Sequence, residues 1–129
     1  MFRTDRDYRG GMKLKRAAVW MLTILLAAEF VVAGLSKFAP ASGWPRMFVA
    51  WGYPSWFRLI VGATEVTCGL ALFAQRARLW AGGVLLAVMA GAAATHLLHG
   101  EPRRVILNVA LSAMLGLLML VQSRDSRIS

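Results

Sequence analysis

The chain has 129 residues, of which 58% are hydrophobic and 16% are charged. A soluble domain of this length could not bury so much apolar surface in one core, so a soluble globular protein is excluded. The net charge of +9 would suit nucleic acid, but its residues flank long apolar runs and disfavour that partner. The single cysteine, Cys68, excludes an intramolecular disulfide, a Cys-x-x-Cys redox pair and a cysteine-rich metal site.

Four apolar runs predict four transmembrane helices. Each run spans most of a hydrocarbon core about 30 Å thick, at about 1.5 Å per residue. Short connections join the second, third and fourth runs, which favours antiparallel packing of these helices. The runs cover residues 17–35, 57–73, 79–98 and 105–121. The predicted fold is therefore an all-α integral membrane bundle of four antiparallel transmembrane helices.

The basic residues predict the orientation of this bundle. Of the 15 lysines and arginines, ten lie before the first run, between the second and third, or after the fourth. By the positive-inside rule, both termini should be cytoplasmic, with residues 1–16 as a basic N-terminal tail and 122–129 as a short C-terminal tail. The bundle itself is assigned to residues 17–121. The bacterial cytoplasmic (inner) membrane is the expected location, and anionic lipid should attract the excess charge.

The first run has one rival interpretation, a cleaved signal peptide beginning at Met12. The run is longer than a usual signal-peptide core, and it contains Glu29, so an uncleaved span is expected. The sequence leaves open whether translation starts at Met1 or at Met12. Residues before Met12 are expected to form a disordered extension.

The connection between the first two runs, residues 36–56, is long and rich in aromatic residues. Pro45 suits the first turn of a short helix, which Gly52 and Pro54 would end. The simplest interpretation is an aromatic belt in the outer membrane interface. The alternative is a lid over a cavity that opens sideways to lipid. The lid candidates are Trp51, Tyr53 and Trp56.

Two glutamates, Glu29 and Glu65, interrupt the first and second runs, where a charge is costly. Counting the helix rise places Glu29 about 9 Å and Glu65 about 12 Å below the outer surface. His96 and Asn108 fall in the same outer half of the membrane. Small residues share the helix faces of both acids, which predicts that the two carboxyl groups point into the bundle and toward each other.

Two such carboxyl groups could not both stay ionised without partners, so a protonated or proton-sharing pair is expected. Candidate counter-groups at the outer mouth are Lys37, Arg58 and His96. The cluster could relay protons, bind a polar head such as a quinone carbonyl, hold a cation, or only fix the helix packing. The ligand or proton-relay candidates are Glu29, Glu65, His96, Asn108 and Lys37.

Two further expectations concern metal binding and the polar residues His99 and Glu101. A metal site built from Glu29, Glu65 and His96 is disfavoured because no ligand spacing supports it. His99 and Glu101 are expected to lie in solvent.

Several short motifs follow one another in a recognisable order: GLSKF at 34–38, GYP at 52–54, GATEVTCGL at 62–70 and ATH at 94–96. By these motifs, residues 17–121 resemble the DoxX and DoxX-like family of small four-helix membrane proteins. The residues that match the family pattern best, none with a known catalytic role, are Lys37, Gly62, Glu65 and Gly69.

The resemblance implies an accessory role in membrane redox chemistry. The family takes its name from a subunit of a terminal quinol oxidase, relatives form part of a thiosulfate:quinone oxidoreductase, and others accompany oxidative-stress enzymes. A quinone is thus the candidate cofactor or ligand, and a membrane or soluble redox protein the candidate partner, with a homo-oligomer left open. The chain shows no haem-ligand pattern or flavin motif, so it should not catalyse quinone chemistry unaided, and its catalytic residues are unknown.

Two other functions remain open. The first is a non-enzymatic scaffold or assembly factor whose buried acids fix the helix packing. The second, a proton-coupled transporter, is weaker because the small bundle lacks the paired broken helices of such proteins.

Overall fold

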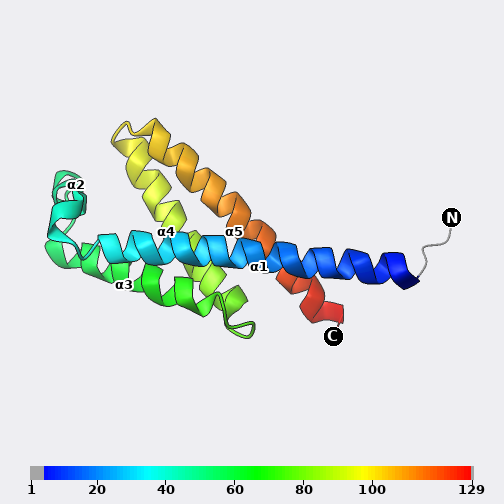
Figure 1. The fold of residues 1–129 in the computed structure, drawn as a ribbon. Helices are drawn as coiled ribbons and strands as arrows, with labels where there is room; N and C mark the ends of the chain where they lie inside the picture. Colours follow the sequence, from blue (N-terminus) through cyan, green and yellow to red (C-terminus); the bar gives the residue numbers. More distant parts are fainter. Residues whose placement is uncertain (1–4, 129) are drawn as a thin grey trace.

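The structure is a computed structural model that describes residues 5–128, and these residues form helices and turns with no strand (Figure 1). Met1, one of the two candidate start residues, the basic residue Arg3 and the last residue, Ser129, lie outside this range. The predicted all-α class is confirmed. The elements are α1 (Asp5–Ser36), the 3-10 turn η1 (Pro40–Ser42), α2 (Trp44–Ala50), α3 (Ser55–Ala71), α4 (Arg78–Leu98) and α5 (Pro102–Ile128).

Within the described residues, three helices are long and apolar enough to cross a membrane. They are α1, α4 and the part of α5 over Pro102–Arg124. The second predicted run forms α3, which begins and ends two residues earlier than the run of 57–73. With 17 residues, α3 is about 26 Å long, slightly shorter than a typical hydrocarbon core.

The helix α1 begins well before the first apolar run. Residues 5–16 continue the same helix as exposed turns, so the expected disordered extension is wrong for this part of the chain. Asp5 and Asp7 lie in the first turn, where carboxylates interact favourably with the helix dipole. Extending a helix that already exists also avoids the cost of nucleating a new one.

The long helices form two packed pairs, α1 with α3 and α4 with α5 (Figure 1). The pairs diverge toward the end of the molecule that carries α2. Toward the other end, they share one hydrophobic core to which all four helices contribute. The buried members of this core are Leu26, Phe30, Cys68, Leu72, Ala81, Leu85, Met89, Leu115 and Leu118.

The closest approach of α1 to α3 occurs where Gly34 faces Gly62. A Cβ atom at Gly34 would lie 2.6 Å from the Gly62 carbonyl oxygen, and one at Gly62 would lie 2.8 Å from the Gly34 carbonyl oxygen. Small residues permit such backbone contact between membrane helices. The contact fixes the rotation of α1, and therefore decides which α1 side chains reach α3.

Arg78 holds the two pairs together at the end opposite α2. Although it is an arginine at the start of a helix, only 5% of the residue is exposed. Its Nε donates a hydrogen bond to the Leu72 carbonyl oxygen at 2.8 Å, and a guanidinium N–H donates to Gln122 Oε1 at 2.9 Å. The ends of α3 and α5 are thus linked through the first residue of α4.

Candidate functional site

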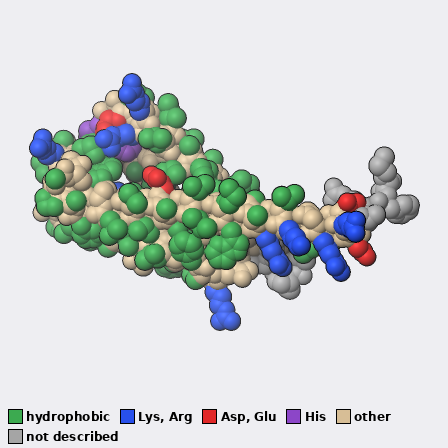
Figure 2. Space-filling model, viewed as in Figure 1, with side chains coloured by type: hydrophobic (Ala, Val, Ile, Leu, Met, Phe, Trp, Pro, Cys, Tyr) green, Lys and Arg blue, Asp and Glu red, His purple; other side chains and the backbone are tan. Residues whose placement is uncertain are grey.

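A cavity of about 560 Å³ lies between the two helix pairs, and α2 contributes to its wall. Figure 2 shows the surface hollowed between α1 and the α4–α5 pair. The wall is mostly apolar, with a few polar side chains from different helices. Size and lining are typical of a site for a small organic molecule or a cofactor. The cavity occupies the region where the pairs diverge, beyond the hydrophobic core.

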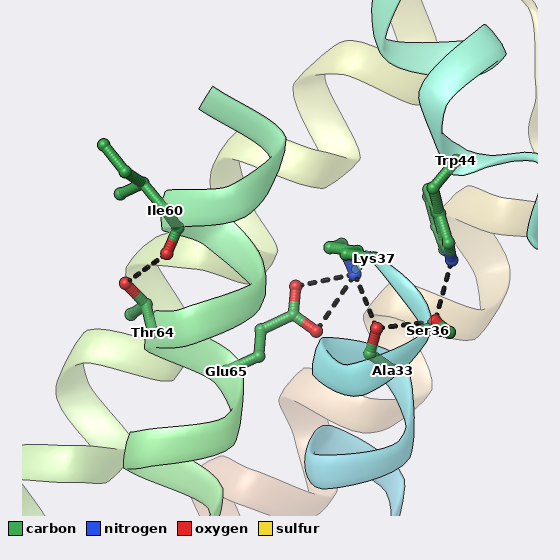
Figure 3. A network of polar contacts seen from close by, with 7 residues as sticks. All are labelled: Ala33, Ser36, Lys37, Trp44, Ile60, Thr64 and Glu65. Atoms are coloured by element: carbon green, nitrogen blue, oxygen red, sulfur yellow. Dashed lines mark hydrogen bonds and ion pairs between the residues drawn. The ribbon is translucent and has the colours of Figure 1, made fainter. Parts of the chain in front are cut away.

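The most buried polar contact on the cavity wall is an ion pair between Lys37 and Glu65. Figure 3 shows the two side chains pointing toward each other from the end of α1 and from α3. Lys37 Nζ lies 2.8 Å from Glu65 Oε1 and 3.1 Å from Oε2. The residues are only 5% and 2% exposed. Lys37 Nζ also donates to the Ala33 carbonyl oxygen at 3.3 Å, so the ammonium group is well satisfied.

The predicted proton-sharing pair of Glu29 and Glu65 is therefore wrong, because Glu65 pairs with Lys37. The reason is the rotation of α1. At 3.6 residues per turn, Glu29 lies about 140° around the helix from Gly34, which faces α3, whereas Lys37 lies about 60° from it. The lysine thus reaches α3 and Glu29 does not.

Glu29 lines the same cavity from a different direction. It is exposed on the wall, on the α1 face that also carries Ala33 and Lys37. Across residues 5–128 the structure contains no hydrogen bond or ion pair to its carboxyl group. Of the two glutamates that line the cavity, Glu29 is thus the one without a partner among the described residues, and it can interact with a ligand.

Glu101 is not in solvent as expected. Its Oε1 accepts a hydrogen bond from Trp51 Nε1 at 2.9 Å, and its Oε2 lies 3.2 Å from Arg104 Nε. The left-handed residue Gly100 turns the chain back, so that the Glu101 backbone N–H donates to the His96 carbonyl oxygen. A glycine favours this conformation because it has no Cβ. His99, by contrast, is exposed.

Two buried polar atoms on the cavity wall make no hydrogen bond within the described residues. His96 and Asn108 are 5% and 9% exposed, and neither His96 Nδ1 nor Asn108 Nδ2 makes a hydrogen bond within the described chain. The 3.5 Å between His96 Nδ1 and Glu101 Oε1 is too long for one. Buried polar groups are normally paired, so these two atoms are available for a ligand. The described residues contain no cluster of three His, Cys, Asp or Glu side chains that could hold a metal.

The helix α2 and the residues just after it connect the two helix pairs and contribute to the cavity wall. It is joined covalently to α1 and α3, and Trp51 contacts the α4–α5 turn through the hydrogen bond to Glu101. Just after α2, Tyr53 Oη lies 2.6 Å from Thr95 Oγ1 of α4. Trp51 and Tyr53 line the cavity, but Trp56 does not and is 58% exposed.

Replacing Trp51 with phenylalanine should loosen α2. The ring contacts to neighbouring aromatic residues would largely remain, but the hydrogen bond to Glu101 would be lost, at a cost of about 1–2 kcal/mol. Amide hydrogen exchange in residues 44–53, followed by mass spectrometry in detergent, should become faster. Trp56→Phe is the matched control, and equal exchange in the two variants would contradict the role assigned to Trp51.

A sequence model of the DoxX-like family matches residues 21–118. No curated protein and no solved structure gives a match to the chain. The matched range runs from the middle of α1 to the second half of α5, so it includes every residue that lines the cavity.

Proposed function

The chain belongs to the DoxX-like family, and from this membership we propose that it is an accessory membrane subunit of a redox or stress-response system whose cavity binds a quinone-like or lipidic ligand. The observation that supports this function best is the cavity itself. It combines an apolar wall with the unpaired buried polar atoms of His96 and Asn108. A carbonyl oxygen of the ligand would accept a hydrogen bond from Asn108 Nδ2, and its apolar part would lie along the wall.

We propose that α1, α3, α4 and α5 form the four antiparallel spans of a bundle in the bacterial cytoplasmic membrane, with both termini in the cytoplasm. Large apolar side chains on the outer faces of the helices support this arrangement, since water would disfavour so many of them. Trp56 and Leu70 of the short helix α3 are 58% and 55% exposed, and Trp80 of α4 is 77% exposed. In this arrangement α2 lies in the outer interface.

Mass spectrometry of the purified protein tests the cavity function. The wild-type protein, extracted in mild detergent, should carry about one prenylated quinone or lipid per chain. Ala33→Leu adds bulk to the cavity wall and should reduce the amount bound several-fold. Ala28→Leu is the control, since Ala28 is exposed on α1 and does not line the cavity. Equal amounts in all three proteins, or none in any, would contradict the proposal.

The scaffold function is favoured by a different observation, the buried Lys37–Glu65 ion pair. This pair is satisfied within the chain, so Glu65 needs no ligand. If the protein is only a scaffold, Glu65→Gln should lower the yield of folded protein, while a partner protein should still co-purify with the molecules that fold. No quinone or lipid should then be recovered in stoichiometric amount.

A further inference from the structure

We propose that the cavity selects an amphiphile that carries a positive charge and that Glu29 binds this charge, an inference that rests on the cavity function proposed above. This inference specifies the charge of the ligand's head group, which the shape of the cavity alone does not determine. An anionic amphiphile of the same size should bind more weakly.

The first support is the balance of charges on the cavity wall. The two permanent cations that line it, Lys37 and Arg104, already contact carboxylates. Lys37 pairs with Glu65 at 2.8 Å, and Arg104 lies 3.2 Å from Glu101. Glu29 is left as the acid without a partner within the described residues. Among the described lysines and arginines of the cavity wall, an incoming anion would therefore find none without a carboxylate contact, whereas an incoming cation would find the carboxyl group of Glu29.

The second support is the position of Glu29 within the bundle. It lies eight residues before Lys37 on one face of α1, which separates the two along the helix axis by about 12 Å. The cavity that it lines has a mostly apolar wall, with side chains of α3, α4 and α5 such as Val61, Val88 and Leu111. Beside an apolar wall, a carboxylate and an opposite charge attract each other more strongly than they do in bulk water.

The third support is the aromatic part of the wall near α2. Phe48, Trp51, Tyr53 and Phe57 all line the cavity, and their rings lie within about 6 Å of one another in pairs. Aromatic faces attract organic cations and repel anions. One such contact already exists, because Lys37 Nζ lies 4.2 Å from the ring centroid of Trp44.

A matched pair of ions tests the inference directly. Tetraphenylphosphonium and tetraphenylborate have nearly the same shape and apolar surface but opposite charges. Their dissociation constants would be measured by isothermal titration calorimetry on the full chain in a non-ionic detergent. Glu29→Gln should weaken binding of the cation about tenfold and leave binding of the anion unchanged or stronger. Glu29→Asp keeps the charge and should retain the preference for the cation.

A control variant distinguishes the effect of removing the charge from the effect of reducing the cavity volume. Ala33→Leu narrows the cavity one turn from Glu29 and should weaken both ions without changing their ratio. Size-exclusion elution and circular dichroism of each variant confirm that it is folded. The inference is overturned if Glu29→Gln binds the cation as tightly as the wild type does. If a quinone or lipid still co-purifies in that case, the proposed cavity function stands; if neither ion binds and nothing co-purifies, that function fails as well.

Discussion

Replacing Lys37 with methionine should destabilise the protein by about 3–5 kcal/mol, because the Glu65 carboxylate would remain buried without its partner. Lys37 and Glu65 are almost completely buried and lie 2.8 Å apart, so water could not replace the lost ammonium group. The double variant Lys37→Met/Glu65→Gln removes both charges and should recover much of the loss. Thermal unfolding in detergent, followed by tryptophan fluorescence, measures the differences.

The control for this prediction is Lys13→Met, which removes an exposed lysine near the start of α1. A single exposed charge contributes little to stability, so the free energy of unfolding of this variant should lie within about 0.5 kcal/mol of the wild-type value. The stabilising role of the ion pair would be contradicted if Lys37→Met were as stable as Lys13→Met. It would also be contradicted if the double variant were less stable than Lys37→Met alone.

Gly34→Ala should have a similarly large effect, a loss of about 3 kcal/mol or more, because the new methyl group would overlap with backbone atoms of α3. It would lie 2.6 Å from the Gly62 carbonyl oxygen and 2.9 Å from the Val66 nitrogen. Backbone atoms of a helix cannot rotate away as side chains can, so α1 and α3 must separate. The same separation should weaken the Lys37–Glu65 ion pair.

Gly83→Ala is the matched control for the glycine contact. No atom lies within 4 Å of a Cβ built at Gly83, and alanine is the better helix former by about 1 kcal/mol. Unfolding of both variants in denaturant should show Gly83→Ala at or above wild-type stability and Gly34→Ala well below it. Equal stability of the two variants would show that α1 and α3 do not pack as closely as described.

The helical class and the DoxX-like family could be predicted from the sequence. Long apolar runs predict helices because their side chains can pack only against lipid or against one another. The sequence also groups His96 and Asn108 with Glu29, Lys37 and Glu65 by their positions along the helices, and the structure places these five residues on the wall of one cavity. Depth depends only on position along each helix, and the helix rise is constant.

The partner of each polar group could not be predicted in the same way, because it depends on how each helix is rotated against its neighbours. Glu29 and Lys37 lie at different angles from Gly34 around α1, so the approach of Gly34 to Gly62 brings the lysine, and not Glu29, to Glu65. The two glycines are visible in the sequence as small residues, but their mutual contact is not. Burial of Arg78 likewise depends on Gln122, which is 44 residues away along the chain.

The role of α2 also depends on tertiary contacts. The aromatic segment before α3 was expected as an interfacial belt or a lid, and periodicity alone does not distinguish these. The contact that positions α2 is the hydrogen bond from Trp51 to Glu101, which is 50 residues away along the chain. It joins the α1–α3 pair to the α4–α5 turn, and the Trp51→Phe experiment measures how firmly it holds α2.

The most direct measurement of the central claim is a crystal structure of the protein grown from a lipidic mesophase without added ligand. The account predicts non-protein density in the cavity between α1 and α5, with a polar atom within hydrogen-bonding distance of Asn108 Nδ2. A cavity filled by protein side chains, with Glu29 directed at acyl chains outside the bundle, would contradict it.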